Sequence, residues 1–193
     1  MNFLAHQYLS FQNPEIQIGN LYGEIVRGKD FENFPGNIRK GILLHRAIDT
    51  FTDAHEIVKK SSQKFHENYG KYSPIIVDVI YDYFLIKNWK TYNDQDFETF
   101  VSDCYALFQS ELRNFPEQLQ FIVNHLIKYD WFHNYQTLEG VESTLKGISQ
   151  RSKFENNIYK AVREVQLNYE ELNEEFNLFF PELINHCKLF LEI

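Results

Sequence analysis

Apolar residues recur mostly at three- and four-residue spacing along this chain, and no stretch of useful length alternates apolar with polar residues. The first pattern places apolar side chains on one side of an α-helix, whereas alternation is typical of a half-buried strand. Glycine and proline are scarce, with 8 and 5 residues in 193. Turns are therefore few and the elements should be long. The pattern predicts a single all-α domain over residues 1–193, built as a bundle of several helices.

Residues that commonly begin or end helices divide the chain further. The expected helices cover residues 1–11, 18–27, 35–52, 54–69, 73–89, 93–112, 116–129, 138–151, 154–179 and 181–193. Asn13 and Pro14 are expected to end the first of these. Thr52 and Asp53 are expected to end the third and to cap the next, because both side chains can accept hydrogen bonds from free backbone N–H groups.

Several classes of protein are excluded by composition. The longest apolar stretch, residues 74–85, is interrupted by Asp78 and Asp82, so no segment is apolar enough to span a membrane. No Lys or Arg precedes the apolar residues at the N-terminus, which argues against a secretory signal. Cys104 and Cys187 are too few and too far apart for a disulfide framework or a cysteine zinc site. A reducing cytoplasm is the expected location.

The net charge of −8 argues against non-specific binding to nucleic acid, which needs clustered cations. The acidic excess falls in residues 73–193. The first part of the chain instead carries a basic stretch, which consists of Arg27, Lys29, Arg39, Lys40, Arg46, Lys59, Lys60 and Lys64. This stretch either faces an acidic partner or a phosphate, or forms a solvated helix face.

His45 and Asp49 are one helical turn apart on the apolar side of their predicted helix. An imidazole and a carboxylate on one face can jointly hold a divalent cation, and burying both without a partner or a metal is costly. Arg46 and Asp49, at i and i+3, can alternatively pair with each other. Asp53 and His55 follow just beyond the expected helix end, where the backbone can turn them inward.

Asp78 and Asp82 are also one turn apart, inside the most apolar helix of the chain. Repulsion would raise the pKa of one carboxyl unless a cation lies between them, which indicates a metal or general-base site. A capping role remains open for one of the two. His6 and Glu24 are further candidates, although each taken alone is more commonly explained as a partly buried histidine bonded to backbone or as an exposed glutamate. Histidines and aspartates spread over several helices fit a metal-dependent hydrolase built inside a bundle.

Short sequence words occur in order from residue 1 to about residue 151. They are Met1-Asn2-Phe3-Leu4-Ala5-His6; Gly19-Asn20-Leu21, Gly23 and Val26-Arg27-Gly28; Gly41-Ile42, Leu44-His45-Arg46, Ile48-Asp49, Phe51-Thr52-Asp53 and His55; Asp78-Val79, Tyr81-Asp82, Phe84-Leu85 and Asn88-Trp89; and Gly140-Val141, Leu145, Ile148-Ser149 and Arg151. Together they resemble the acyl carrier protein phosphodiesterase family. The run from His45 to His55 is the most specific part.

This resemblance implies an all-helical fold, distantly similar to the HD-domain metal-dependent phosphohydrolases. It implies a hydrolase of lipid metabolism that removes the 4′-phosphopantetheine arm from holo acyl carrier protein, usually with manganese. The positions that match the family's pattern are His6, His45, Arg46, Asp49, Asp53, His55, Asp78 and Asp82. Acyl carrier protein would be the partner, and neither nucleic acid nor a membrane is expected.

The chain departs from the family pattern at a few positions. Glu24 stands where the family usually has Asp, and Tyr8 and Tyr83 stand where histidine is common. Glu56 replaces a proline that often follows His55. The departures keep two alternatives open: an HD-like phosphohydrolase acting on a small phosphodiester or nucleotide, and a carrier-binding homologue without turnover.

Roles for these residues follow from their chemistry. The expected metal ligands are drawn from His6, Glu24, His45, Asp49 and Asp82. The expected catalytic set is Asp49, Asp53, His55, Asp78 and Arg46. In it, Asp78 or Asp53 orients or deprotonates the attacking water, and His55 protonates the leaving serine oxygen.

The positive side chains have a separate expected role. Arg46 or Arg27 would clamp a non-bridging phosphate oxygen, and with Arg39 and Lys40 they would contact the phosphate or the acidic carrier. Tyr81, Tyr83 and Trp89 either line a channel for the arm or pack in the core.

Overall fold

The computed structural model describes all 193 residues and contains helices and turns but no strand. The α-helices are α1 (Phe3–Tyr8), α2 (Pro14–Gly23), α3 (Gly36–Ala54), α4 (Glu56–Tyr69), α5 (Ser73–Lys87), α6 (Trp89–Tyr92), α7 (Phe97–Glu111), α8 (Glu117–Lys128), α9 (Trp131–Asn134), α10 (Leu138–Arg151), α11 (Val162–Leu167) and α12 (Tyr169–Leu191). Short 3₁₀ turns are η1 (Asp30–Asn33), η2 (Gly70–Tyr72), η3 (Leu112–Asn114) and η4 (Ile158–Ala161). The all-α prediction is confirmed.

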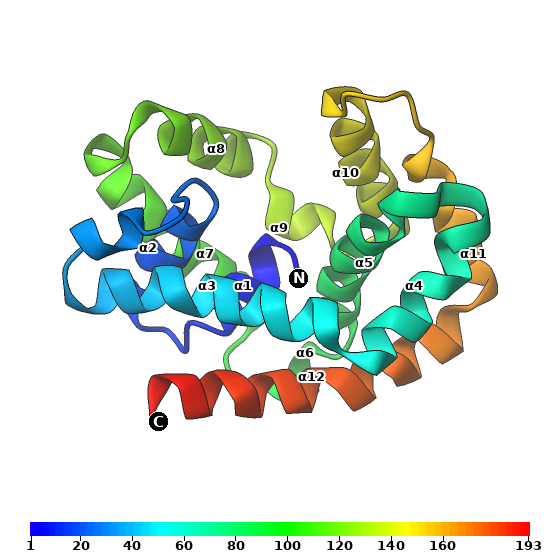
Figure 1. Cartoon of the computed structure of the whole chain (residues 1–193), viewed down its shortest axis with the longest axis horizontal. Helices are drawn as coiled ribbons and strands as arrows, with labels where there is room; N and C mark the ends of the chain where they lie inside the picture. The colour runs from blue at the N-terminus through cyan, green and yellow to red at the C-terminus, as the bar shows by residue number, and fades with distance from the viewer.

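The helices form two groups that meet around α1 (Figure 1). One group contains α2, α3, α7 and α8, and the other contains α4, α5, α10 and α11. The long helix α12 packs against both α3 and α4 and so joins the two groups along one edge. The C-terminal segment, for which the sequence indicated no role, therefore braces the helix that carries His45 and Asp49.

A single continuous core of 44 buried apolar residues connects these helices. Helix α5 is apolar on all sides, as expected for a helix surrounded by others. Tyr81 and Tyr83 on this helix, and Trp89 just after it, are at most 5% exposed. All three belong to the buried core, which is the second of the two roles expected for them.

Helices α2 and α3 touch through their backbones. A Cβ on Gly19 would lie 2.2 Å from the carbonyl oxygen of Ile38, and a Cβ on Gly41 would lie 2.4 Å from that of Ile16. Any larger side chain would hold the helices apart. These two glycines therefore bring the face of α2 that carries Asn20 and Gly23 directly against His45.

Two predicted helix boundaries near the N-terminal half were wrong. Asn13 and Pro14 begin α2 and do not end α1, because the Asn13 side chain accepts a hydrogen bond from the backbone N–H of Ile16 at 3.2 Å. Helix α3 continues past the expected end at Thr52 and Asp53 to Ala54. Thr52 is buried inside it and does not cap the next helix. His55 caps α4 instead, with its Nδ1 accepting from the N–H of Ile57 at 3.3 Å.

The boundaries predicted near the C-terminus were also wrong. The expected break at Pro181 does not occur, and α12 runs through it from Tyr169 to Leu191. Pro181 is exposed and removes only one backbone hydrogen bond, while the buried Phe179, Phe180 and Leu183 keep both sides of it packed on the core. The true break is at Asn168, between α11 and α12.

Candidate metal centre

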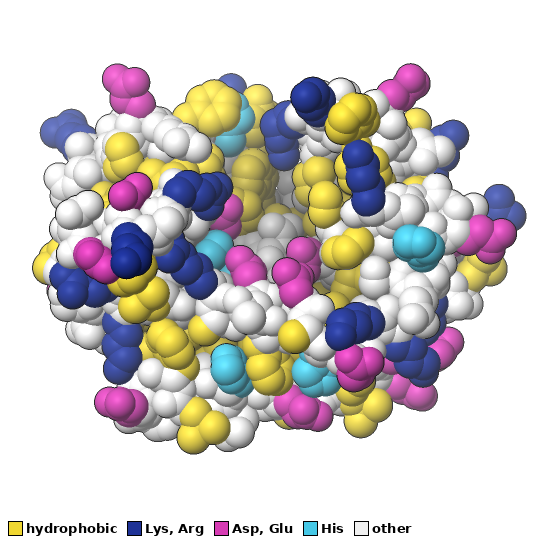
Figure 2. Space-filling view, viewed as in Figure 1, with side chains coloured by type: hydrophobic (Ala, Val, Ile, Leu, Met, Phe, Trp, Pro, Cys, Tyr) yellow, Lys and Arg dark blue, Asp and Glu magenta, His cyan; other side chains and the backbone are white.

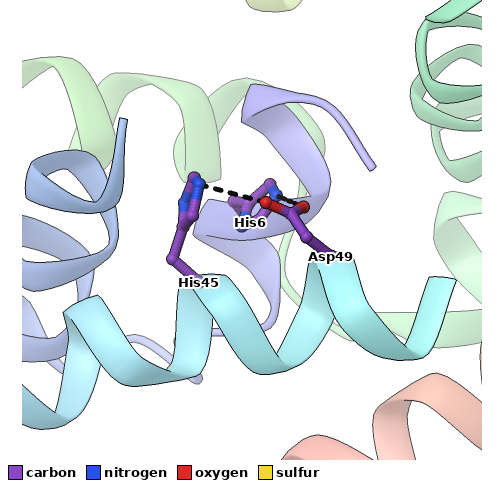
Figure 3. Close-up of side chains that lie close together, drawn as sticks. All are labelled: His6, His45 and Asp49. Atoms are coloured by element: carbon purple, nitrogen blue, oxygen red, sulfur yellow. Dashed lines mark hydrogen bonds and ion pairs between the residues drawn. The ribbon is translucent and has the colours of Figure 1, made fainter. Parts of the chain in front are cut away.

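Side chains from two helices converge at one point (Figure 3). His6 comes from α1, and His45 and Asp49 come from α3. The Nε2 atom of His6 is 3.1 Å from Asp49 Oδ1, and that of His45 is 3.3 Å from Asp49 Oδ2. One ligand atom from each residue lies within 4.8 Å of the others. His45 and Asp49 therefore share one face as predicted, and His6, also an expected ligand, lies beside them.

Asn20 on α2 sets the orientation of both imidazoles. Its Nδ2 donates hydrogen bonds to the carbonyl oxygen of His6 at 2.9 Å and to Ser10 Oγ at 3.2 Å. Its Oδ1 is therefore left to accept from Nδ1 of His6 at 2.9 Å and from Nδ1 of His45 at 3.0 Å. Each Nε2 therefore faces Asp49, and in the tautomer with the proton on Nδ1 its lone pair would be free for a metal ion bound between the three side chains.

The space for the His45 ring exists because Gly23 has no side chain. A Cβ on Gly23 would lie 2.3 Å from Cγ of His45. The ring fits between α2 and α3 and stacks on the His6 ring with centroids 4.2 Å apart. A side chain at position 23 would therefore displace the His45 ring from this cluster.

The protonation states of the cluster suit metal binding. Burial, and then the neighbouring His6, lowers the pKa of His45 to about 3, so its imidazole is neutral at pH 7. Burial alone would raise the pKa of Asp49, but a hydrogen bond from His6 and nearby positive charge lower it to about 2. A neutral imidazole and an ionised carboxylate are the forms that bind metal ions.

The three residues lie at the edge of an acidic cavity of about 290 Å³. Its lining consists of Met1, Asn2, Phe3, His6, Glu24, His45, Asp49, Asp53 and Asp78. Figure 2 shows acidic and histidine side chains on the floor of a hollow between the two helix groups. Asp78 accepts a hydrogen bond from the amino group of Met1 at 2.8 Å. The cavity therefore gathers four carboxylates and two imidazoles at one place.

Two carboxyl groups of this cavity are shifted toward their protonated forms. Burial raises the pKa of Glu24, although the positive charge of His6 opposes the shift. Burial, and then the negative charge of Asp78, raises the pKa of Asp53. Carboxyl groups of this kind keep a proton to a higher pH than an ordinary Glu or Asp does.

The comparison with known families decides what this chain is similar to. The family model described as acyl carrier protein phosphodiesterase matches residues 1–183. The chain belongs to the acyl carrier protein phosphodiesterase family. The resemblance stated from the sequence words is therefore confirmed, while the distant likeness to HD-domain proteins stays a prediction.

Relatives of similar length carry the same name. A protein named acyl carrier protein phosphodiesterase from Escherichia coli O6:H1 is 30% identical over 189 residues, covering 97% of both chains. Its namesake from Photorhabdus laumondii is 28% identical and covers 97% of this chain and 96% of its own. No solved structure matches the chain. None of the helices is both long and apolar enough to cross a bilayer.

Asp82 does not join the cluster in this member of the phosphodiesterase family, contrary to the expectation from sequence. The side chain is fully buried, and its Oδ2 and Oδ1 accept hydrogen bonds from the backbone N–H groups of Leu4 at 2.9 Å and Ala5 at 3.2 Å. Burial raises its pKa to about 7, against the effect of these two bonds. Both oxygens are used at the first turn of α1, so Asp82 positions the helix that carries His6.

His55 and Arg46 also lie away from the cavity lining. His55 caps α4 and places its Nε2 3.3 Å from Glu182 Oε2 on α12, so the expected role as proton donor to a leaving serine has no geometric support. Arg46 donates hydrogen bonds to the carbonyl oxygens of Gly28 at 2.7 Å and Val26 at 3.2 Å. Arg46 therefore holds the segment between α2 and α3.

The other predicted contact residues are divided between two places. Arg27 donates to the carbonyl oxygen of Glu24, and Arg39 donates to carbonyl oxygens of the same α2–α3 segment. Lys40 instead bonds the carbonyl oxygen of Leu191 near the C-terminus. The lysines of α4 pair with acidic residues: Lys59 with Glu56, and Lys60 and Lys64 with Glu171 and Glu175. The basic stretch is therefore not one surface.

The departures from the family pattern fall in different surroundings. Tyr8 packs against Trp89 and Phe180 and donates a hydrogen bond to the carbonyl oxygen of Tyr92. Tyr83 is buried against the core, and neither tyrosine lines the acidic cavity. Glu24 does line it. The two positions without the family's histidines therefore lie outside the acidic cavity. Among these departures only Glu24, which is one carbon longer than Asp, lines it.

Asn20 is the functional residue that sequence reasoning missed. It stands in the word Gly19-Asn20-Leu21, but the reasoning treated that word only as a mark of the family. An asparagine of 1% exposure inside a helix needs several hydrogen-bond partners. Its burial was the signal, and the sequence did not reveal it.

Proposed function

We propose that this chain is a divalent-metal-dependent phosphodiesterase that hydrolyses the bond between 4′-phosphopantetheine and the serine of holo acyl carrier protein. The proposal rests on one observation above all. Two imidazole Nε2 atoms and a carboxylate lie around a common point, and the side-chain oxygen of Asn20 bonds the Nδ1 atom of both rings. The family supplies the substrate, because its curated relatives are named for acyl carrier protein.

His6, His45 and Asp49 are the proposed ligands, with Glu24 as the nearby carboxylate that can complete the set. Mixed nitrogen and oxygen donors suit Mn²⁺ among other divalent ions, and manganese is our proposed metal. When bound, such an ion lowers the pKa of a coordinated water and polarises a phosphoryl oxygen. Asp82 is not in the proposed set, because its oxygens are already used by α1.

The remaining carboxylates of the cavity handle protons in this proposal. Asp78 is held in place by the amino group of Met1, and Asp53 lines the same wall. These two orient the attacking water, and Asp53 accepts its proton. Asp53 then gives this proton to the leaving serine oxygen, in place of His55.

The acidic carrier is proposed to dock beside the α2–α3 segment. Arg27 contacts the backbone of Glu24, which lines the cavity, and Arg46 follows the ligand His45 on α3. Arg27, Arg39 and Arg46 bond backbone carbonyl oxygens and pair with no carboxylate, so their charge is available to a partner. Figure 2 shows a group of basic side chains beside the acidic floor of the hollow. Complementary charge of this kind orients an approaching partner.

The test is incubation of the chain with holo acyl carrier protein and Mn²⁺, followed by measurement of the carrier's intact mass. We expect the mass to fall by that of the 4′-phosphopantetheine group. Asp49→Asn should abolish this loss, whereas Asp94→Asn, which changes an exposed carboxylate outside the cavity, should retain it. An unchanged holo mass with the wild-type chain at saturating Mn²⁺ would overturn the proposal. Hydrolysis of small phosphodiesters alone would favour a different substrate.

A further inference from the structure

A second and larger cavity adjoins the metal centre. Its volume is about 520 Å³, within the range of sites that take small organic ligands. Helices α8, α9 and α10 supply most of its walls. Asn2 and Phe3 line both cavities, so the two hollows share one wall just beyond the N-terminus of α1. Figure 2 shows the hollow continuing from the acidic floor to the region between the two helix groups.

The chemistry of this lining differs sharply from that of the metal centre. The larger cavity has no carboxylate in its lining, whereas the acidic cavity has four. Aromatic rings come from Phe3, Tyr129, Trp131 and Tyr135. Amide and hydroxyl groups that can donate and accept hydrogen bonds come from Asn134, Ser143, Thr144 and Gln150. His125, Lys146 and Arg151 complete the lining, and their N–H groups can donate hydrogen bonds to carbonyl oxygens. Such a lining favours a chain that carries amide groups and apolar segments and no positive charge.

Gly147 lines this cavity without adding a side chain that would fill it. It lies inside α10, where glycine is less favourable than alanine. A Cβ at this position would meet only Nη1 of Arg151 at 3.5 Å, an ordinary contact. At Gly140, by contrast, a Cβ would lie 1.7 Å from the carbonyl oxygen of Asn134. Packing therefore requires a glycine at 140 but not at 147, where its effect is to leave the cavity open.

We propose that this larger cavity binds the pantetheine arm of the substrate, with the phosphate at the metal centre and the amides and thiol extending past Asn2 and Phe3. The inference rests on the proposed function for the identity of the substrate. The arm is a chain with two amides, a hydroxyl and a thiol, so its carbonyl oxygens can accept hydrogen bonds from the amide, hydroxyl and basic groups of the lining. It also gives a role to the sequence word around Ile148 and Arg151, because both residues line this cavity and neither lines the metal centre.

Filling the cavity from α10 tests the inference. In Gly147→Leu the new side chain projects into the cavity, and in Gly147→Ala only a methyl group is added. Binding of pantetheine, which carries no phosphate, is measured on the metal-free protein by saturation-transfer NMR. We expect Gly147→Leu to weaken binding at least tenfold and Gly147→Ala to change it less than threefold. Gln150→Trp, which fills the cavity from its exposed rim, should weaken binding in the same direction.

Kinetics with two substrates separate the inference from the proposed function. In the presence of Mn²⁺, Gly147→Leu should raise KM for holo acyl carrier protein at least tenfold. The same variant should hydrolyse bis(p-nitrophenyl) phosphate, which has no arm, within twofold of wild type. His45→Ala should lose both hydrolyses and still bind pantetheine.

The outcomes distinguish the arm-binding inference from the proposed phosphodiesterase function. Unchanged pantetheine binding in both Gly147→Leu and Gln150→Trp, or no binding to the wild-type protein, would overturn the inference even if the carrier is hydrolysed. Pantetheine binding that Gly147→Leu blocks would support the inference even if the carrier is not hydrolysed, and the proposed function alone would then fail. An equal loss of activity on both substrates in a folded Gly147→Leu protein would also count against the arm site.

Discussion

Asn20 contributes no ligand atom, yet its one side-chain oxygen accepts hydrogen bonds from both histidines of the proposed metal centre. Removing a residue that holds metal ligands in place commonly changes metal affinity by about 10–100-fold. We expect Asn20→Ala to weaken Mn²⁺ binding within that range, measured by titration with detection of free Mn²⁺ by electron paramagnetic resonance. Asn20→Asp, which keeps an acceptor for both rings, should retain more of the affinity.

A matched control for this experiment is Asn68→Ala. Asn68 is exposed, bonds Glu164 on α11 and does not line the acidic cavity. Unchanged Mn²⁺ affinity in Asn20→Ala would mean that the imidazoles keep their orientation without Asn20. The assignment of Asn20 as a positioning residue would then be wrong.

Asp82 provides a second prediction at the scale of one side chain. In Asp82→Asn one acceptor oxygen becomes an NH₂ group that faces a backbone N–H of α1. Leaving a buried backbone donor unsatisfied costs about 1–3 kcal/mol, so the free energy of unfolding in urea should fall by that amount. Mn²⁺ should still bind to the folded variant. Loss of Mn²⁺ binding with unchanged stability would instead identify Asp82 as a ligand.

Residue patterns predicted part of this site. The one-turn spacing of His45 and Asp49 placed them on one face, because helix geometry relates residues four apart. The same spacing suggested that Asp78 and Asp82 act together, and here it misled. Asp82 meets backbone groups 77 and 78 residues away, a contact that only the tertiary fold specifies.

The close crossing of helices α2 and α3 brings residues from these two segments together. Gly19→Ala would place a Cβ 2.2 Å from a backbone carbonyl oxygen of α3, so α2 and α3 must move apart. We expect a loss of about 1–3 kcal/mol in the free energy of unfolding, which is typical of overpacking. The separation should also weaken Mn²⁺ binding, because Asn20 and His45 lie on opposite sides of this crossing.

Gly147→Ala serves as the control for that prediction, since it adds the same methyl group to a helix where the space is free. It should leave the free energy of unfolding unchanged or raise it slightly. If Gly19→Ala is as stable as wild type and binds Mn²⁺ equally well, close backbone contact is not what positions the site.

Helix identities were easier to predict from sequence than helix ends. The three- and four-residue spacing indicated helices throughout, and the expected helix end at residue 69 and helix start at residue 73 agree with the structure. Residues with two possible roles produced the errors. Pro14 can follow a helix or begin one, and only the Asn13 hydrogen bond to Ile16 decides between them. Pro181 can end a helix unless its neighbours are buried on both sides, as they are in α12.

The charge of the whole molecule affects how it can bind an acidic carrier protein. The net charge is −8, so an acidic partner must meet a local excess of basic side chains. Arg27→Gln should raise KM for holo acyl carrier protein several-fold, whereas Lys59→Gln, which removes a cation already paired with Glu56, should have little effect. Added salt should raise KM in the wild-type protein by screening the same attraction. A KM that is insensitive to salt and to Arg27→Gln would place the docking surface elsewhere.

Placement of the two cavities was beyond what the sequence could predict. Their walls combine residues near the N-terminus with residues of α3 and α5 on one side and α8–α10 on the other. No periodicity relates segments so far apart in the chain. The sequence words did include members of both walls, such as His45 and Ile148, but they did not reveal that one cavity is acidic and the other has no carboxylate.

The central claim is that His6, His45 and Asp49 hold one divalent ion. Crystals of the protein grown with Mn²⁺ test it directly through anomalous scattering at a wavelength where manganese scatters strongly. We predict one dominant anomalous peak within bonding distance of both Nε2 atoms and of an Asp49 oxygen. At full manganese loading, a dominant peak at any other residues, or no peak between these three, would contradict the account.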